Sequence, residues 1–486
     1  MIRPSPQPND RHARSPQQPV TPPDTAPQPA STAVAPPDEA VLLRGVLRSP
    51  GYLKTLLFCA LVGVPVSLAA FWFLVGLRQL EHLVWADLPH ALGRDGPPWW
   101  WPLPLLLLSG VCVAQIVTRL PGAGGHVPAS GMHAGGTGPA ALPGVVLAAV
   151  FSLPLGAVLG PEAPLIAMGG GLAIAFRRLA RAPMSSRSTA LLGAAGAAAA
   201  IAAIFGNPLI ASVLLMEIAG VGGPQLFAVM LPALLSSGVG SLVFTGFGRW
   251  TGLGTGNLSL KLHMTASRLD AGDVVWAVVI GVVLGAVVHL IQYVGRLAAV
   301  QVARRPLRAT TLCAFGAGVC AACYALFTGR TPVDVASSGQ ATLATLTADP
   351  HAWGVGALIA VLLCKGLGYG LCLGSLRGGP IFPAILLGAA AGILFAPLPG
   401  LGVIPGLAAG MAATATSAMR LPVSSVVLVV LVLGSTVMIP VVILSAVVAF
   451  VTTALLPTGP PVPPVPRVTR TQPSGAPGTP PDPPAP

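Results

Sequence analysis

Apolar residues run through most of this chain, from Thr55 to Leu456, and only short polar segments interrupt them. A helix needs about 20 consecutive apolar residues to cross a bilayer, and stretches of that length recur along the chain. The pattern predicts one membrane domain over 41–456, with halves of similar length at roughly 50–250 and 270–456. The apolar segments lie near 55–77, 99–117, 142–159, 162–176, 189–219, 224–247, 274–300, 309–328, 353–373, 380–396, 402–418 and 422–456.

Two pairs of these segments do not have the pattern of simple spans. Segments 142–159 and 162–176 are short and are separated by Gly160-Pro161, and segments 380–396 and 402–418 are also rich in Gly and Pro. Irregular backbone survives at membrane depth only where protein or a water-filled cavity solvates it. Broken helices at matching places in two halves indicate a solute site where the halves meet. We therefore predict an all-α membrane protein of tilted and broken helices, arranged as an inverted repeat, although no residue-level repeat is visible.

The two ends of the chain have a different composition. Residues 1–40 and 457–486 consist mainly of Pro, Ser, Thr, Gln and Ala, with few large apolar side chains. Such segments cannot bury enough surface to offset the entropy lost on ordering. We expect two disordered tails, no cleavable signal peptide and no folded regulatory domain after the membrane domain.

Composition agrees with a membrane protein, since 53% of the residues are hydrophobic and 8% are charged. The net charge of +12 would suggest nucleic-acid binding in a soluble protein, but many basic residues flank the apolar segments, so no nucleic-acid partner is expected. Basic residues before the first span predict a cytoplasmic amino terminus. Cys320 and Cys323 form a lone CxxC inside an apolar segment, which favours buried thiols over a metal site. We expect no metal and no cofactor.

Acidic residues are scarce in the first half. Between Asp95 and Asp270 the chain has two, Glu162 and Glu217, and both lie inside apolar segments. A carboxylate near the bilayer centre costs a few kcal/mol, so it usually faces a partner or a water-filled path. A neutral or paired structural acid is the alternative interpretation.

Glu162 stands at a predicted helix start, in the sequence LGPEAPL (159–165). Proline suits the first helical turn, and the free N–H groups there attract anions. A carboxylate at this place can occupy an anion site and compete with a dissolved anion. Protonating or displacing Glu162 would then open a path, so we predict that Glu162 is a gate.

Two glycine-rich stretches are further candidates for anion binding: LPGAGGHVP (120–128) and RGGPIFP (377–383). Glycine lets backbone N–H groups approach a ligand closely, and main-chain dipoles bind an ion without trapping it. A plain turn explains either stretch taken singly.

These motifs together resemble the CLC family of chloride channels and proton-coupled chloride exchangers. GPEAP (160–164) is similar to the family's G(K/R)EGP motif, GGHVP (124–128) to GSGIP, and GGPIFP (378–383) to the GxFxP region. FGNPL (205–209) through Glu217 resembles F(N/R)xPLxGxLFxxEE, and Lys365 matches a basic position upstream of GxFxP. The similarity covers about 400 residues, with the motifs in family order.

The resemblance implies a helical fold of two inverted halves, a homodimer with one anion path in each subunit, and a bacterial-type inner membrane location. It identifies Glu162 as the gating glutamate, which in exchangers also carries a proton. The positions that would bind chloride or a similar anion are Gly124, Gly125, His126, Gly160, Gly379, Ile381 and Phe382.

The chain also departs from the family pattern. Gly125 replaces the serine of GSGIP, and Pro380 lacks an N–H. Ile218 replaces the second glutamate of the EE pair, which is the internal proton-transfer residue of many exchangers, so only Glu217 remains for a proton path or a structural role. No tyrosine follows Tyr369, so the family's pore tyrosine is missing. These departures favour a passive or weakly proton-coupled chloride path, with a proton-coupled chloride or fluoride exchanger as the alternative.

Two residue roles have two interpretations each at this level, and one alternative function class remains. Lys365 either attracts anions into a vestibule or extends to the membrane interface. His126 either binds an anion or satisfies backbone groups of its own loop. A membrane-embedded hydrolase using Ser130 or Ser152 with His126 or His133 is a remote alternative, because no known hydrolase motif is present. We therefore expect that the protein is not an enzyme.

Overall fold

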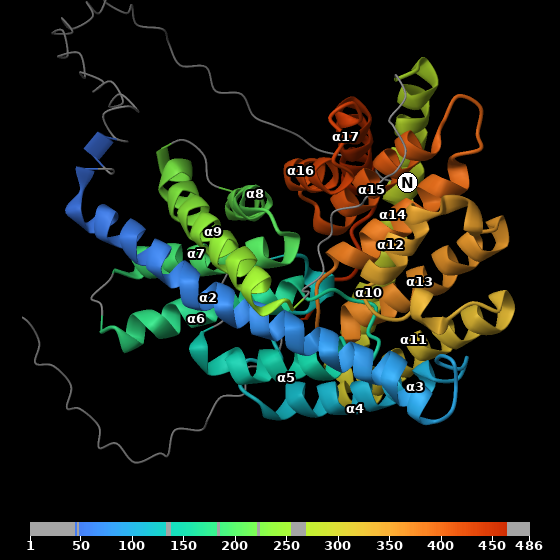
Figure 1. Ribbon diagram of the computed structural model, residues 1–486, viewed down its shortest axis with the longest axis horizontal. Coiled ribbons are helices and arrows are strands. Elements are labelled where there is room, and N and C mark those ends of the chain that lie inside the picture. Colours follow the sequence, from blue (N-terminus) through green and yellow to red (C-terminus); the bar gives the residue numbers. More distant parts are fainter. Residues whose placement is uncertain are drawn as a thin grey trace, which may run out of the picture.

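The computed structural model describes residues 44–45, 48–132, 138–181, 185–220, 224–253 and 269–463, and these residues are mostly helical (Figure 1). The longer helices are α2 (Pro50–His82), α4 (Pro102–Arg119), α5 (Leu142–Ser152), α6 (Glu162–Leu179), α7 (Ser186–Phe205), α8 (Pro208–Ala219), α9 (Pro224–Thr251), α10 (Ala271–Arg304), α11 (Pro306–Thr328), α12 (Gln340–Ala348), α13 (Val355–Ser375), α14 (Ile381–Phe395), α15 (Val403–Met419), α16 (Pro422–Leu433) and α17 (Ile439–Leu455). Short helical segments are η1 (Leu83–Asp87), α3 (Leu88–Ala91), η2 (Pro128–Ser130), η3 (Pro139–Ala141), η4 (Pro332–Asp334) and η5 (Pro350–Ala352).

The predicted tails lie almost wholly outside these residues. Residues 1–40 and 464–486 are not among those described, whereas 457–463 are described without regular secondary structure. The domain limits at 41–456 therefore stay a prediction.

Seven of the described helices are long and apolar enough to cross a membrane. Their outward faces are apolar as well. On α10, for example, Val275, Val283 and Leu290 are exposed, whereas Ile280 and Leu284 are buried. Exposing so many large apolar side chains to water would be unfavourable, so lipid is the solvent of this surface. The chain is a multi-pass integral membrane protein, as the hydrophobic pattern predicts.

Helices α14 and α15 lie inside the bundle. All residues from Ile381 to Ile393 are buried, as are all residues from Ile404 to Met419. The two helices approach closely because Gly388 faces Gly410 and Gly392 faces Gly406, and a β-carbon at any of these would collide with the opposite backbone. Small residues permit such close packing in membranes. This packing confirms that segments 380–396 and 402–418 are short internal helices and not simple spans.

Contacts between helices distant in sequence hold the two halves together. Figure 1 shows α2 running diagonally across the molecule, from α6, α7 and α9 at one end to α3 at the other. Across the halves, α4 packs against α11 and α8 packs against α16. The starts of α6 and α14, at Glu162 and Ile381, are both buried inside this assembly. The predicted all-helical membrane fold is confirmed.

Candidate anion site

Glu162 is buried at the first position of α6, with 1% of its surface exposed. Its Oε1 accepts a hydrogen bond from the backbone N–H of Phe382 at 3.0 Å, although the two residues are 220 positions apart. The amides of Ile381 and of Glu162 itself lie beside the same carboxyl group. Among the described residues, Oε2 has no hydrogen-bond partner. The carboxyl group therefore lies where two helix starts, α6 and α14, present free N–H groups to one point.

Gly160 and Gly379 form the wall around this carboxyl group. The N–H of Gly160 donates to the carbonyl of Gly379 at 2.8 Å, and the N–H of Gly379 donates to the carbonyl of Gly160 at 2.5 Å. A β-carbon added at either glycine would overlap the carboxyl group of Glu162. Only a residue without a side chain lets backbone approach a ligand this closely.

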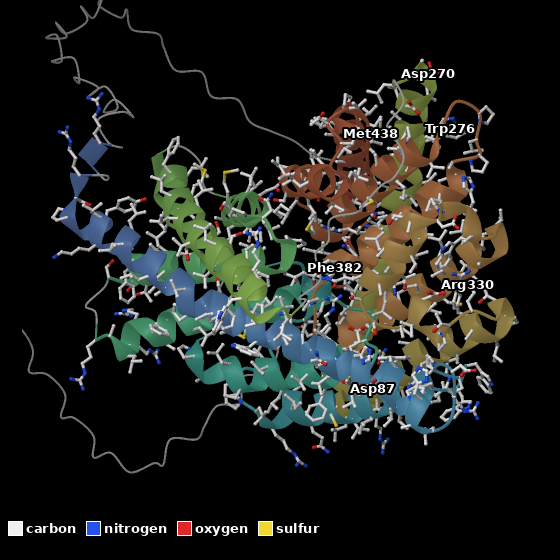
Figure 2. All side chains as sticks on the ribbon, in the orientation of Figure 1. Asp87, Asp270, Trp276, Arg330, Phe382 and Met438 are labelled. Atoms are coloured by element: carbon white, nitrogen blue, oxygen red, sulfur yellow. The ribbon has the colours of Figure 1, made fainter. Side chains whose placement is uncertain are left out.

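Two aromatic residues complete the surroundings. Phe382 is 1% exposed and stacks on Phe205 at the end of α7, with 5.8 Å between ring centroids. Figure 2 places Phe382 near the middle of the molecule. The Tyr369 hydroxyl donates to the carbonyl of Pro380 at 2.7 Å and lies close to Glu162. Tyr369 thus fixes the peptide just before the α14 start, a role that the sequence did not suggest, because a single tyrosine in an apolar span carries no motif.

Gly124, Gly125 and His126 lie on a separate loop. Gly124 and Gly125 have φ of 71° and 93° and pack against α5, at Ala148 and Val145. The His126 ring hydrogen-bonds the carbonyl of Gly131 within its own loop. The structure brings Glu162, Gly160, Gly379, Ile381 and Phe382 together. The 124–126 loop does not join this group directly. It contacts Arg377, two residues before Gly379.

Glu217 and Ile218 occupy the end of α8. The Glu217 carboxylate accepts hydrogen bonds from the backbone N–H groups of Val423 and Ser424, at 3.0 and 2.7 Å, and from the Ser424 hydroxyl at 2.5 Å. It therefore caps the start of α16, where the first amides of a helix lack internal partners. Ile218 is half-buried and packs against the main hydrophobic core.

This geometry predicts a structural cost for losing the cap. We expect Glu217→Ala to lower the free energy of unfolding by about 1–2 kcal/mol, because three donors lose their acceptor. Thermal unfolding in detergent checks this, with Glu217→Gln as the control that retains one acceptor oxygen. Unchanged stability combined with altered proton movement would contradict the capping role.

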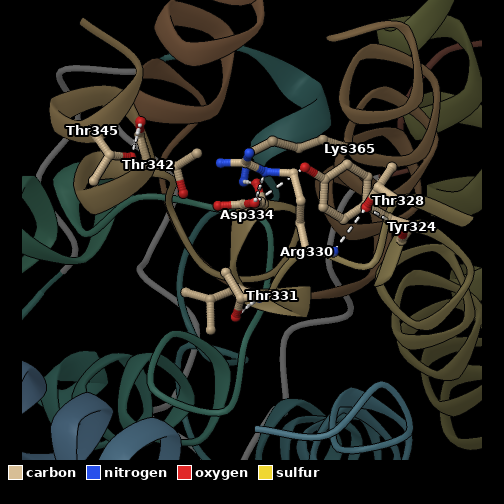
Figure 3. Close-up of polar contacts among 9 residues, drawn as sticks. Tyr324, Thr328, Arg330, Thr331, Asp334, Thr342, Thr345 and Lys365 are labelled. Carbon is tan, nitrogen blue, oxygen red and sulfur yellow. Dashed lines mark hydrogen bonds and ion pairs between the residues drawn. The ribbon is translucent and has the colours of Figure 1, made fainter. Parts of the chain in front are cut away.

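Lys365 is fully buried on α13 and holds a loop in place (Figure 3). Its ammonium group donates to four consecutive carbonyls, those of Asp334, Val335, Ala336 and Ser337, at 2.9–3.4 Å. The Asp334 carboxylate in turn accepts from Arg330 Nε at 3.2 Å and from the Tyr324 hydroxyl at 3.1 Å. Burial raises the pKa of Asp334, and Arg330 opposes that shift.

Two cavities reach residues next to the site in the chain. A cavity of about 410 Å³ lies between α2 and the 333–342 segment and reaches Leu159 and Pro161, next to Glu162; Glu81 lines it. A smaller cavity of about 90 Å³ reaches Pro380, next to Ile381. Residues next to Glu162 and next to Ile381 in the chain thus each line a cavity.

Other predicted residues show different contacts. The Ser130 hydroxyl donates to the carbonyl of Val127 at 2.8 Å and lies 3.5 Å from His126 Nδ1, while Ser152 is buried on α5. His133 lies outside the described residues. In the described part of the chain, no three His, Cys, Asp or Glu side chains gather to hold a metal ion.

Comparison with known proteins places these observations in a family. A family model described as voltage gated chloride channel matches residues 116–454. The protein named "Putative ion-transport protein YfeO" of Escherichia coli is 26% identical over 359 residues, which cover 70% of this chain and 79% of that protein. Its Salmonella paratyphi A counterpart is 27% identical over 360 residues, covering 70% and 81%.

Solved structures share the fold. A slow cyanobacterial Cl⁻/H⁺ antiporter has a TM-score of 0.68 and 19% identity, over 82% of this chain and 94% of that one. A CLC-type fluoride/proton antiporter has a TM-score of 0.64 and 20% identity, over 83% and 96%. The CLC-like helical fold that the motifs imply is confirmed.

Proposed function

Since this chain belongs to the family of voltage-gated chloride channels, we propose that it moves chloride or a similar small anion through a path that the Glu162 carboxyl group closes. Anion transport follows from family membership, and gating by Glu162 is the specific proposal. The observation that carries it is the hydrogen bond from the Phe382 amide to Glu162 Oε1, at the meeting point of two helix starts. Donors arranged in this way bind a negative group, and a tethered carboxylate competes there with a dissolved anion.

Opening the path requires the carboxyl group to leave the Phe382 amide. A protonated carboxyl group is a poorer acceptor than a carboxylate, so protonation weakens the bond and favours displacement by an anion. The cavities beside Pro161 and Pro380 would supply the two approaches.

Weak or absent proton coupling is the second part of the proposal. An exchanger needs a titratable group that passes protons between Glu162 and the solution on one side of the membrane. Ile218 has no titratable group, and the Glu217 carboxylate is engaged by three donors at α16. A proton-coupled exchanger for chloride or fluoride is the second candidate, because the unpartnered Oε2 of Glu162 is free to hold a proton.

Assembly and orientation complete the proposal. Family membership supports a homodimer with one path in each subunit. The bacterial relatives support an inner membrane location. Arg44, Arg48 and Lys54, at or just before the start of α2, support a cytoplasmic amino terminus.

Replacing Glu162 tests the gate. In liposomes loaded with chloride, we expect efflux through the wild-type protein to rise as the pH falls, because protonation releases the carboxyl group from the Phe382 amide. Efflux through Glu162→Ala should be independent of pH, since alanine has no carboxyl group to close the path. Asp95→Ala is the matched control, because Asp95 is exposed in the loop before α4 and lines neither cavity.

Two results would count against the proposal. If Glu162→Ala retains both the wild-type rate and its pH dependence, Glu162 is not the gate. If a chloride gradient drives protons uphill through the wild-type protein at a fixed ratio, the transport is tightly coupled and the exchanger is correct.

A further inference from the structure

Arg377 is a buried arginine between the two glycine-rich stretches. It lies between α13 and α14, two residues before Gly379, and 3% of its surface is exposed. Its side chain reaches the other stretch, because a β-carbon on Gly124 would lie 3.5 Å from Arg377 Cγ. Gly379 abuts the Glu162 carboxyl group, so Arg377 lies two residues from the candidate anion site along the chain and contacts the loop at Gly124.

The charge of Arg377 has no carboxylate partner in the described part of the chain. Arg377 Nε donates to the carbonyl of Ala123 at 3.4 Å, and Nη1 donates to the carbonyl of Leu376 at 3.2 Å. The ion pairs found among the described residues are His82–Asp87 and Arg330–Asp334. No hydrogen bond from Nη2 to a described residue is found.

A buried guanidinium cannot lose its proton, so its charge must be compensated. Without a partner, a buried charge costs several kcal/mol. The carbonyls at the end of α13 offset part of this cost, because a helix carboxyl end carries partial negative charge. Two neutral acceptors leave the net positive charge in place, so an anion beside the guanidinium would be stabilised.

We propose that Arg377 binds the transported anion, a small monovalent inorganic ion. Its guanidinium would supply a side-chain hydrogen-bond donor in place of the serine hydroxyl that is absent at Gly125. This inference rests on the proposed function and names a further binding residue for the same path. Arginine offers five N–H donors in a rigid fork, of which two are used here. A 90 Å³ cavity reaches Pro380, three residues after Arg377, and Arg296 and Arg420 line it.

A merely structural Arg377 would tie the loop at Ala123 to the end of α13. Both interpretations predict damage when the guanidinium is removed, so stability by itself does not separate them. The chloride dependence of the variants does, because an anion that binds only the folded protein stabilises it by an amount that grows with anion concentration and with affinity. If Arg377 were only a structural tie, its removal would leave the half-saturating chloride concentration unchanged.

The experiment uses the purified full-length protein as wild type, Arg377→Gln, Arg377→Lys and the control Arg94→Gln, which removes an exposed arginine. Thermal unfolding is measured while chloride replaces gluconate at constant ionic strength, and initial chloride efflux is measured against chloride concentration. We expect wild type and Arg94→Gln to gain stability with chloride. For Arg377→Gln, the half-saturating chloride concentration should rise about tenfold or more, with Arg377→Lys between it and wild type.

Each outcome decides the proposal. A chloride-independent wild-type melting temperature overturns it, even if Arg377→Gln does not fold. An Arg377→Gln half-saturation within twofold of wild type overturns it as well. If Glu162→Ala leaves flux unchanged while chloride stabilisation depends on Arg377, gating by Glu162 fails and the Arg377 site stands.

Discussion

Replacing Lys365 with methionine is expected to lower the free energy of unfolding by about 3 kcal/mol, because buried carbonyls lose a charged hydrogen-bond donor. The Lys365 ammonium group is fully buried and donates to the four carbonyls from Asp334 to Ser337. Methionine matches its length but leaves these carbonyls without a donor, and buried acceptors without partners are costly. Thermal unfolding in detergent and the yield of monodisperse protein measure the effect.

Lys54→Met is the matched control for this prediction. Lys54 is exposed at the start of α2, so the same substitution there should change stability by less than about 0.5 kcal/mol. If Lys365→Met unfolds at the wild-type temperature and instead weakens chloride binding, Lys365 attracts anions and does not hold the loop. One variant thus separates anion attraction, which the sequence suggests, from the loop contact that the structure shows. Extension to the membrane interface is excluded, because Lys365 is fully buried.

Replacing Gly379 with alanine should expel the Glu162 carboxyl group from its position. The added β-carbon would overlap Oε2 and would lie 2.9 Å from Glu162 Cβ, so a rotation of the carboxyl group cannot relieve the clash. We expect chloride efflux through Gly379→Ala to lose its pH dependence, as in Glu162→Ala. Flux into liposomes over a range of pH measures this.

The double variant and a control glycine sharpen the prediction. Gly379→Ala combined with Glu162→Gly removes every Glu162 atom that the new β-carbon would meet, so its flux should match Glu162→Gly alone and the two effects should not add. Gly356→Ala, on α13, places a β-carbon in open space and should behave as wild type. Wild-type pH dependence in Gly379→Ala would show that the Glu162 carboxyl group does not have to lie beside Gly379 to control chloride flux.

Much of the fold follows from local pattern. The apolar runs identify the membrane segments, since hydrocarbon excludes charge and demands helices. Proline and glycine mark the breaks at Gly160-Pro161 and near Pro380, because neither residue continues a regular helix well. The scarcity of acids in the first half singles out Glu162, and its place after Pro161 predicts a helix start. All of these signals act within a few residues of one another.

Contacts across the chain needed the tertiary structure. No local pattern pairs Gly160 with Gly379, or gives Lys365 four carbonyls of a loop about thirty residues away. Motif resemblance suggested that the two glycine-rich stretches meet near Glu162, but not that Arg377 bridges them. A single tyrosine, lysine or arginine in an apolar segment forms no sequence pattern, so its partner in the folded protein cannot be predicted from the sequence.

The sequence by itself determined which segments enter the membrane, where helices break and which carboxylate stands at a helix start, because solvent and backbone sterics act locally. The tertiary structure decided which N–H groups meet that carboxylate, what compensates Lys365 and that Arg377 lacks a carboxylate partner among the described residues. Those facts depend on how helices far apart in the chain pack, and in a low-dielectric interior the partner of a charge sets its energy.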